Sequence, residues 1–575
     1  MNYLPRIVLI AFIAVFAVGS VQAQKKSSKK TVKQKTATPK KKEDKPVTVI
    51  KEAGDTSAPK VVTITSAFKP FLKDAAKVNF TAATPVIDSS KIPVAYTIPS
   101  QNLFFLYQPV SIKPLALLID TGFIWENDQY IKVGAGNFST YYGEAAFSFG
   151  DGKNSITNIR GNFLTSTGHL PAQQAAKWGV DLISIFNTKN NHEWTAHPFY
   201  QSSTQYLYGY LPSTLSYTKE SLLQQFSTVG LELGMQNKTA NSFGITYHPQ
   251  ISAGRFFDNN EAHENYLLIK APVSKSFGKI YSFNLGLTAD ISTTTFPLIP
   301  NPLVIHNNLY YLNPSIQFKT PNVKINAGIQ PTWDNKTFYL LPDLTAEAKF
   351  SEINLSLEAG WQGYFQKNTY RSLANFNPWI GRPGSLKNTK INEQFAGVKG
   401  TQGDHFTYHA RVSLLTLDNQ PLFTNALGDG KTFNVVYDTA IKAVRLHGEI
   451  GYTDQEKLSI TAGATFTKYS AGVSYPKAYG LLPLEITGSL KWKILKDLQV
   501  KSDVFVWDGA QYLGTAGQGK AKAVADLNLG AEFTVMPRLN LWIQMNNLLN
   551  STYQRWNQYS VLGFNVLGGV VYSFR

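Results

Sequence analysis

A repeated alternation of apolar and polar residues constrains this chain more than any other feature of its sequence. Residues 525–549 show the alternation twice, on either side of a turn at Met536-Pro537. The apolar residues of one parity are Leu527, Leu529, Ala531 and Phe533 before the turn, and Leu539, Leu541, Ile543 and Met545 after it. A period of two predicts extended strands with one apolar and one polar face. Both a half-buried sheet in a soluble protein and a barrel in a membrane would produce this pattern.

The lengths of the connections between strands favour the membrane barrel. Ten short turns lie at 150–154, 187–191, 235–241, 274–279, 319–322, 349–352, 399–404, 453–457, 495–497 and 536–538. They alternate with longer connections at 201–224, 256–262, 294–304, 367–391, 417–431, 470–480, 509–520 and 549–560. Outer-membrane barrels combine tight turns at one end with long loops at the other. Ten turns imply twenty strands, and further strands at 129–137 and 561–575 give a predicted total of about 22.

The polar faces of these strands carry both signs of charge, which predicts a water-filled interior and an apolar face turned towards lipid. The predicted lining of this lumen comprises Arg445, Glu449, Lys491, Asp526 and Glu532. A sheet in lipid must close on itself, because each unpaired edge amide costs several kcal/mol there. The predicted fold class is therefore all-β, a transmembrane antiparallel β-barrel over residues 128–575.

Aromatic residues support this interpretation. They make up 13% of the chain, and Trp361, Trp492 and Trp542 lie near predicted strand ends. Girdles of aromatic side chains at the two membrane interfaces would account for them. The last strand carries Tyr572 and Phe574 and ends one residue later. These two residues resemble the carboxyl-terminal signal that the barrel assembly machinery reads in nascent barrels.

The amino-terminal residues predict export from the cytoplasm. Residues 1–23 contain a basic Arg6, an apolar stretch and a Val-Gln-Ala cleavage site, which together predict a signal peptide. Ten lysines against two carboxylates give residues 25–45 a net charge of +8. We therefore expect residues 24–60 to form a disordered periplasmic tail that contacts an anionic partner or a membrane surface, not nucleic acid. The segment 61–127 is expected in the periplasm or the lumen.

The carboxyl-terminal residues resemble the last hairpin of TonB-dependent outer-membrane receptors. In that family a strand ends in an Asn-Leu-aliphatic-Asn run, followed by Tyr, an aromatic outer loop and a glycine-containing strand with a terminal aromatic. The matching positions are Asn547, Leu548, Leu549, Asn550, Tyr553, Trp556, Gly563, Gly568, Gly569 and Phe574. The resemblance covers residues 128–575, and it implies a barrel of twenty-two strands.

The region before residue 128 departs from that family. Such receptors place a plug domain of about 130 residues inside the barrel, but only residues 61–127 separate the tail from the first predicted strand. The stretches at 66–80 and 130–149 are similar to those of plugless, receptor-like barrels of Bacteroidota. Residues 46–50 and 61–65 resemble the short box that contacts TonB. Coupling to TonB and blockage of the pore by 66–127 both stay open.

Two motifs resemble enzyme sites, but each lacks a feature that the corresponding site requires. Residues 514–521 fit a phosphate-binding loop, but Ala521 replaces the hydroxyl that binds Mg²⁺, and a strand is expected next. His192 and His197 lie one residue off the zinc-protease spacing, and on a strand they would point to opposite faces. The sequence therefore predicts no catalytic residue, no metal site and no cofactor.

Two long loops are the best candidates for contacting a ligand. The candidate contacts are Tyr206, Tyr208, Tyr210, Arg371, Trp379 and Arg382. Aromatic rings with amides and guanidinium groups suit sugars or peptides, which they bind by stacking and hydrogen bonding. The same residues would equally fold inward and rigidify the mouth of the barrel, or would contact a protein partner.

The predicted function is passage of a polar solute through a receptor-like barrel in the cell outer membrane, with the tail in the periplasm. The alternative is a structural or assembly subunit of an outer-membrane protein complex, in which the tail or residues 66–127 dock a partner protein. Outer-membrane lipid and the barrel assembly machinery are the expected partners of both.

Overall fold

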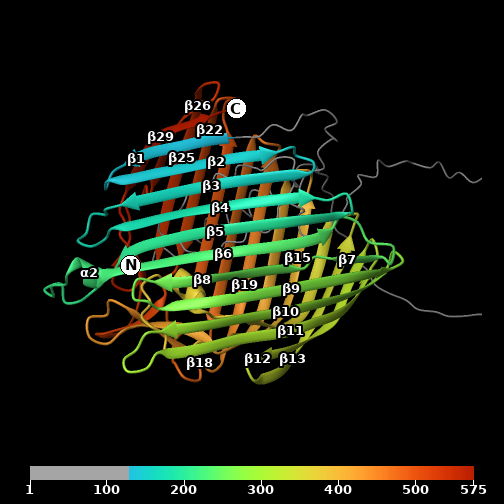
Figure 1. Ribbon diagram of the computed structural model, residues 1–575, viewed down its shortest axis with the longest axis horizontal. Coiled ribbons are helices and arrows are strands. Elements are labelled where there is room, and N and C mark those ends of the chain that lie inside the picture. The colour runs from blue at the N-terminus through green and yellow to red at the C-terminus, as the bar shows by residue number, and fades with distance from the viewer. Residues whose placement is uncertain (1–128, 575) are drawn as a thin grey trace, which may run out of the picture. The chain divides into compact units, whose positions relative to one another are not determined.

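An antiparallel sheet that closes on itself forms the barrel (Figure 1). The computed structural model describes residues 129–574, so the predicted signal peptide, the basic tail and the segment 61–127 lie outside the described residues. The sheet contains 23 strands, of which β7 and β8 share one position, so the barrel has 22 strand positions as predicted. In the described part of the chain, no helix is both long and apolar enough to span a membrane.

The strands of the first half of the barrel are β1 Gln129–Gly136, β2 Thr140–Gly150, β3 Ser155–Ser166, β4 Ala175–Asn187, β5 His192–Tyr206, β6 Leu223–Asn237, β7 Ile245–Tyr247, β8 Gln250–Asp258, β9 His263–Phe277, β10 Tyr281–Phe296, β11 Leu303–Lys319 and β12 Val323–Asp334. Those of the second half are β13 Thr337–Phe350, β14 Leu355–Gln366, β15 Thr389–Gln402, β16 Phe406–Asp418, β19 Ile441–Asp454, β20 Leu458–Tyr469, β21 Leu484–Lys493, β22 Leu498–Trp507, β25 Val524–Met536, β26 Leu539–Asn546 and β29 Asn565–Ser573.

The remaining elements belong to the loops at one end of the barrel. They are α2 Lys219–Leu222, α3 Tyr370–Phe376, β17 Gln420–Asn425, β18 Phe433–Asp438, β23 Gln511–Gly514, β24 Gly517–Lys520, β27 Gln554–Trp556 and β28 Tyr559–Ser560. Three two-stranded hairpins form from these strands: β17 with β18, β23 with β24, and β27 with β28.

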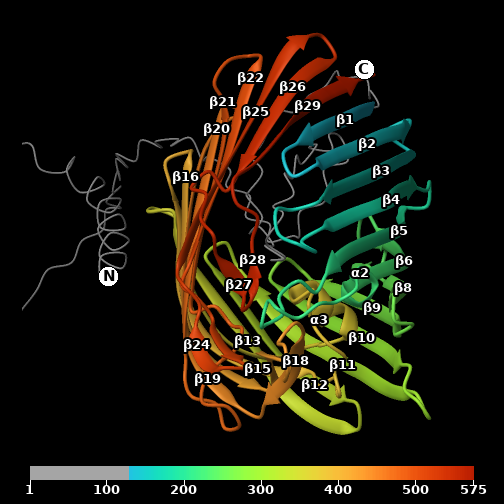
Figure 2. The ribbon, with the colours of Figure 1, turned by 90° about the vertical axis from the view of Figure 1, so that its left-hand side faces the viewer.

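The first and last strands of the barrel pair with each other and close the wall. The register places Ile131 opposite Tyr572 and Gly134 opposite Gly569. Figures 1 and 2 show β1, in blue, lying directly beside β29, in red. Glycine is required at this seam, because a Cβ on Gly134 would lie 2.3 Å from the ring of Trp542.

All ten predicted short turns fall between consecutive wall strands, at the end of the barrel where β1 begins. The other end carries the long loops, but three of its connections escaped prediction: 137–139, 167–174 and 335–336. Two of these connections are as short as the turns of the opposite end, so their length alone could not show at which end of the barrel they lie. Asn335 adopts a φ of 54°, which asparagine tolerates and which allows the tight reversal there.

One wall position is interrupted, and proline explains the break. β7 and β8 both pair with β9, and His248 and Pro249 separate them. Proline has no backbone N–H to donate to the neighbouring strand, so the ladder stops there and resumes at Gln250.

The alternation predicted from the sequence appears as two faces of the wall. On β19, the side chains of Val444 and Leu446 are 41% and 46% exposed on the outside. On β25, Phe533 is 45% exposed on the same face, whereas Asp526 of the opposite face is 4% exposed. The outside of the barrel is therefore apolar and the polar face turns inward, as a wall between hydrocarbon and water requires.

The expectation for one girdle tryptophan was wrong. Trp361 and Trp492 lie on the outer face, 43% and 40% exposed, but Trp542 faces the interior and is 5% exposed. Its Nε1 donates a hydrogen bond to the carbonyl of Val133 at 3.2 Å, and Lys132 Nζ lies 4.1 Å from its ring centroid. The position of Trp542 near a strand end suggested a girdle, but its parity with Asn540 and Gln544 places it inside.

A candidate site beneath the long loops

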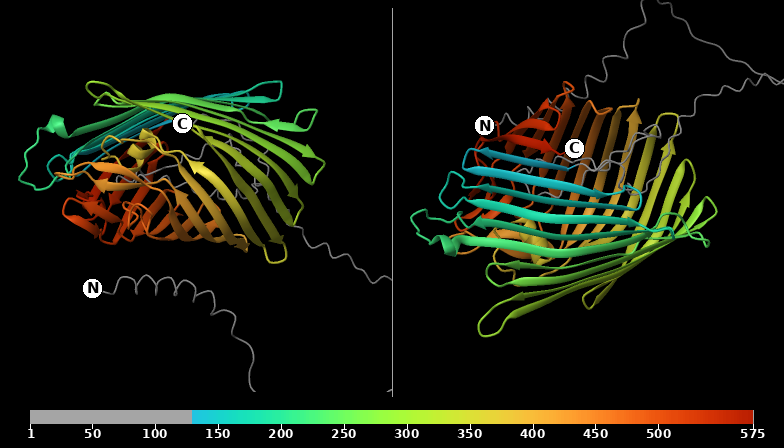
Figure 3. Two further views of the ribbon diagram at one scale, coloured as in Figure 1. Left: turned by 90° about the horizontal axis from the view of Figure 1, so that it is seen from below. Right: turned by 45° about the horizontal axis from the view of Figure 1, so that its top comes forward.

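Several long loops fold into the barrel at the long-loop end and pack on one another (Figures 2 and 3). We call the loops 207–222, 367–388, 419–440 and 547–564 the loop layer. Its apolar core consists of Phe226, Phe256, Ala262, Phe296, Tyr370, Leu373, Ala374, Ile380, Leu386, Phe423, Phe433, Trp556 and Tyr559. The members come from the wall strands β6, β8 and β10, from the loop between β8 and β9, and from the loops that follow β14, β16 and β26, so the core joins distant parts of the ring across the interior.

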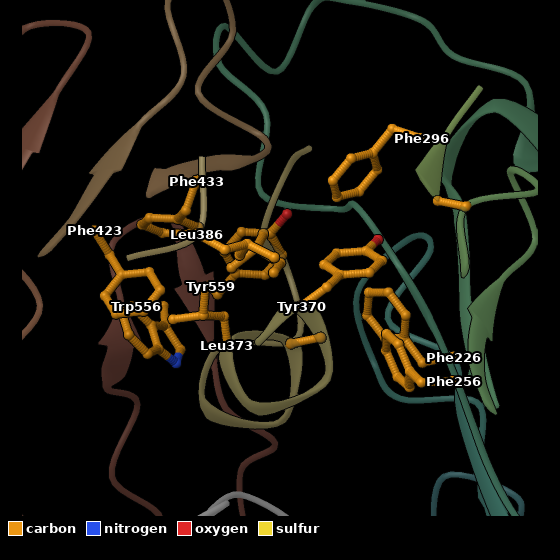
Figure 4. Packing of buried hydrophobic residues seen from close by; sticks show 13 residues of the cluster. Phe226, Phe256, Phe296, Tyr370, Leu373, Leu386, Phe423, Phe433, Trp556 and Tyr559 are labelled. Atoms are coloured by element: carbon orange, nitrogen blue, oxygen red, sulfur yellow. The ribbon is translucent and has the colours of Figure 1, made fainter. Parts of the chain in front are cut away.

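Aromatic rings dominate this core (Figure 4). The ring of Tyr370 lies between Phe296 and Phe256, with centroids 5.0 Å and 5.2 Å away. Trp556 contacts Phe423 and Phe433 at 5.1 Å and 5.4 Å. Edge-to-face aromatic pairs add about 0.5–1.5 kcal/mol each beyond their burial. The core therefore holds the loops together as a small folded unit inside the wall.

Buried polar groups attach loop 367–388 to the wall. Asn388 Nδ2 donates hydrogen bonds of 2.7 Å to Asn307 Oδ1 on β11 and to Asp334 Oδ1 on β12. The backbone N–H of Tyr370 donates to Glu264 Oε2, also at 2.7 Å. Lys367 forms an ion pair of 2.5 Å with Asp290. Because these groups are largely buried, breaking one partner leaves another unsatisfied, which makes the attachment rigid.

A second attachment joins two loops to each other. Asp429 Oδ2 accepts hydrogen bonds from Lys431 Nζ at 2.6 Å and from Tyr217 Oη at 2.5 Å, and Lys431 Nζ lies 4.4 Å from the Tyr217 ring centroid. Burial acts to raise the pKa of Asp429, but the bonds from Lys431 and Tyr217 outweigh it and lower that pKa. Burial likewise opposes the charge of Lys431, and Asp429 outweighs it and raises the pKa of Lys431.

The predicted ligand contacts separate into two groups. Tyr208 and Trp379 come together on Tyr559: Trp379 stacks on the Tyr559 ring at 4.1 Å, and Tyr208 meets it edge-on at 4.9 Å. The others stay apart, with Arg371 over Tyr266, Arg382 near Phe296, Tyr206 beside Lys219, and Tyr210 beside Tyr217. The inward fold was one of the three alternatives left open for these loops.

A cavity of about 130 Å³ lies where Tyr208, Trp379 and Tyr559 meet the wall of β3, β4 and β5. Its lining also includes Gln173, Gln174, Lys177, Gln205, Arg555 and Trp556. Burial raises the pKa of Tyr208 to about 12, and its hydroxyl donates to the carbonyl of Ser560 at 2.8 Å. Arg555 and Tyr559 were not among the predicted contacts. The aromatic content of 549–560 was visible, but nothing in the sequence placed that loop against 203–217.

The predicted lumen residues lie at different heights of the inner wall. Asp526 accepts a hydrogen bond of 2.7 Å from Tyr553 at the long-loop end. Lys491 and Glu532 line one polar recess of about 550 Å³ towards the short turns, where Glu532 accepts from Asn540 at 2.7 Å. On β19, Arg445 Nε donates to Thr467 Oγ1 at 3.3 Å, and Glu449 lies 3.9 Å from the His447 ring nitrogen.

A cluster of charged residues on the inner wall was not among the predicted residues. Glu358 on β14 accepts hydrogen bonds from Arg411 Nη2 at 2.6 Å and His409 Nε2 at 3.0 Å, and Lys399 lies 3.6 Å away. All four residues have inward parity in their strands, so the alternation rule applied to β14–β16 would have found them.

The two motifs that mimic enzyme sites have structural roles. Residues 514–521 belong to the β23–β24 hairpin and its exit, and Lys520 pairs with Asp508 at 2.6 Å. His192 contacts Tyr247 and His197 contacts Glu232, so the two histidines share no neighbour there. Within residues 129–574, no group of three or more His, Cys, Asp or Glu could hold a metal ion.

Comparison with known proteins identifies the fold. No protein-family model matches the sequence, and no curated protein matches it significantly. Solved structures do match. The FrpB iron transporter from Neisseria meningitidis shares 11% identity over 78% of this chain and 82% of its own, with a TM-score of 0.60. The siderophore receptor PirA from Acinetobacter baumannii shares 9% over 78% and 80%, with a TM-score of 0.61.

The ferripyoverdine receptor of the outer membrane of Pseudomonas aeruginosa gives the same result. It shares 12% identity over 78% of this chain and 72% of its own, with a TM-score of 0.59. The likeness is one of fold. At such low identity it transfers the barrel architecture, whereas activity and ligand must be argued from the residues of this chain.

Proposed function

We propose that the chain is a receptor-like barrel of the outer membrane that passes a polar solute. The observation that carries this proposal is the wall itself: 22 antiparallel strand positions, an apolar outside and a charged inside, in the architecture of transport receptors. Charged groups such as Glu358, Arg411 and Lys491 would offer a solute hydrogen-bonding partners along its path. The proposal includes the lumen roles of Arg445, Glu449, Lys491, Asp526 and Glu532.

The orientation follows from the same proposal. The short turns would face the periplasm, the loop layer would face the outside, and the amino-terminal tail would stay in the periplasm. The barrel assembly machinery would read Tyr572 and Phe574, whose rings lie 5.2 Å apart at the end of the last strand.

Measurements of conductance in planar lipid bilayers test whether solutes pass through the lumen of the barrel. Because the loop layer crosses the interior, we expect the full chain to conduct weakly. A variant in which a short Gly-Ser linker replaces 369–386 loses Tyr370, Leu373 and Leu386 from the core and should conduct in clear steps. A folded variant that conducts no better than the full chain would overturn passage through this lumen. Folding is checked by the shift in electrophoretic mobility that folded barrels show on heating.

The loop layer also favours the second candidate function, a non-transporting subunit of an outer-membrane complex. Loops that pack on one another inside the wall would suit a structural barrel, which passes no solute. Purification from native membranes separates the two candidates. A stoichiometric partner that stays bound to a barrel without conductance, with or without 369–386, would favour the structural role.

A further inference from the structure

A shallow groove of about 540 Å³ lies on the outer face of the wall, over strands β12 to β16. Alanines form its floor, because Ala359 lies opposite Ala346 on one side and Ala396 on the other. The side chains of Trp361 and Leu414, 43% and 53% exposed, border this floor on the same face. The groove is therefore largely apolar and lies on the face that we expect hydrocarbon to cover.

The polarity of the outer face changes just beyond this groove, towards the long loops. On β15, Gln394 belongs to the lining, and Asn392 and Lys390 precede it on the same face, nearer the loops. The Nε1 of Trp361 donates a hydrogen bond of 2.7 Å to Asn392 Oδ1. Tryptophan side chains are enriched where hydrocarbon meets the lipid headgroups, so this contact indicates the edge of the hydrocarbon on the long-loop side.

Two exposed lysines lie at the same edge, on the strands next to the groove. Lys468 on β20 is opposite Val444 on β19, whose side chain is 41% exposed on the outer face. Lys442 lies two residues before Val444, so it shares that face. Diagonal neighbours on adjacent strands lie about 7–8 Å apart. The two ammonium groups are therefore close enough to contact one ligand.

The charges at this edge favour an anion. Asp418 on β16 lies diagonally from Lys442, but Lys390 Nζ pairs with its Oδ2 at 2.6 Å. Within residues 129–574, no ion pair neutralises Lys442 or Lys468. Lys468 lies two strands away from Leu414 of the groove, a distance of about 10 Å. One amphipathic molecule can therefore contact the groove with its apolar part and the lysines with an anionic head.

We propose that this surface binds an anionic, phosphate-bearing lipid of the outer leaflet. One acyl chain would fill the groove over Ala359, and the phosphate would contact Lys442 and Lys468. The groove has more than three times the volume of a ~150 Å³ cavity that holds benzene, so a long chain has room. A groove that nothing fills loses dispersion contacts along its lining. The inference rests on the proposed orientation of the barrel, and it is independent of the passage of a solute.

Native mass spectrometry of the purified protein in detergent tests the site, because it counts the lipids that stay bound. The probes are dipalmitoyl phosphatidic acid, dipalmitoyl phosphatidylcholine and dihexanoyl phosphatidic acid, which vary the charge of the head and the length of the chains separately. We expect the long-chain phosphatidic acid to bind about thirtyfold more tightly than phosphatidylcholine, as two lysines near an anionic head predict. Equal affinities for these two lipids, or for the two phosphatidic acids, would overturn the proposal.

Substitutions separate the contacts of the head from those of the chain. Lys442→Gln and Lys468→Gln should each weaken the binding of long-chain phosphatidic acid about fivefold and leave that of phosphatidylcholine unchanged. Ala359→Leu fills the floor of the groove, so it should weaken both long-chain lipids by the same factor. Lys275→Gln is the control for charge, at an exposed lysine on β9 near the short turns. Ala462→Leu is the control for size, on β20 and outside the lining.

The binding measurement is independent of transport. Lipid binding with no conductance from the variant lacking 369–386 would retain the site and reject the passage function, and conductance without lipid binding would do the reverse. An unchanged affinity for phosphatidic acid in folded Lys442→Gln and Lys468→Gln would overturn the proposal. So would a dimer of the chain that Ala359→Leu dissociates, because a second copy would then cover the groove in place of a lipid.

Discussion

At the scale of single residues, buried carboxylates hold the loops in place. Asp438, which is fully buried, accepts hydrogen bonds from the backbone N–H groups of Ala440, Val473, Ser474 and Tyr475 at 2.8–3.2 Å. The bonds tie the loop before β21 to the end of β18. A carboxylate with several backbone donors is a strong local attachment, because its removal leaves each of those donors unpaired.

Asp438→Ala should therefore release this loop. We expect a loss of about 1–3 kcal/mol in the free energy that holds the loop in place, seen as faster tryptic cleavage after Lys477. Asp508→Ala is the control, since Asp508 is 34% exposed and pairs with a Lys520 that is 45% exposed. Such surface pairs contribute about 0–1 kcal/mol, so cleavage should barely change. Equal cleavage rates in the two variants would contradict the role of Asp438.

The contact between Asp429, Lys431 and Tyr217 should depend on pH in a predictable way. The pKa of Asp429 is lowered in the fold, so its contribution is complete above the usual carboxylate pKa and is lost as pH falls through the folded value. The pKa of Lys431 is raised, so its contribution is lost only as pH rises through that higher value.

We therefore expect loops 207–222 and 419–440 to stay attached from about pH 5 to about pH 10. Hydrogen exchange at the backbone N–H of Leu211, which donates to the carbonyl of Asp429 at 2.9 Å, measures the attachment. After correction for intrinsic exchange rates, protection should fall only outside that range. Asp429→Asn should reduce protection at neutral pH, and a wild-type chain that loses protection near pH 7 would contradict the assignment.

At the scale of elements, the alternation of apolar and polar residues predicted the strands of the wall. It carried no information about how the loops pack. Period two and the ten short turns depend on neighbours in the sequence, so the strands, their faces and their number followed from the chain. The packing of Tyr370 on Phe256, or of Trp379 on Tyr559, joins residues more than a hundred positions apart. No local pattern encodes such contacts, and for this reason the sequence did not predict Arg555 and Tyr559 as residues of the candidate site.

The attachment of loop 367–388 gives an element-scale prediction. Asn388→Ala removes a buried amide and leaves Asn307 and Asp334 without that partner. We expect the attachment to weaken by about 2–6 kcal/mol, the combined cost of two unsatisfied groups at about 1–3 kcal/mol each. Hydrogen exchange at the N–H of Asn377, which closes the last turn of α3, should speed up accordingly. Asn301→Ala, in an exposed loop, is the control and should leave that exchange unchanged.

At the scale of the whole molecule, closure depends on the glycines of the seam. A side chain at Gly134 would collide with Trp542, and one at Gly569 would lie 1.9 Å from the carbonyl oxygen of Val133. Gly569→Val meets a backbone atom that cannot move aside without breaking the pairing of β1 with β29. We expect this variant to lose the heat-dependent shift in electrophoretic mobility that marks a closed barrel.

Gly448→Val provides the matched control. Gly448 lies in the wall strand β19, and a Cβ added to it would have no neighbouring atom within 4 Å, so a valine there meets open space. It should keep the mobility shift of the wild-type chain. A closed barrel in both variants would show that the seam tolerates side chains, whereas failure of both would point to strand glycines in general.

Because β1 pairs with β29, the barrel closes only when its last strand is present. A chain that ends before residue 565 would lack β29 and would expose the unpaired edges of β1 and β26 to hydrocarbon, where each unsatisfied peptide group costs several kcal/mol. A chain without β29 thus cannot close its barrel in the bilayer. A stable position in the bilayer therefore requires β29 to be paired on both of its edges.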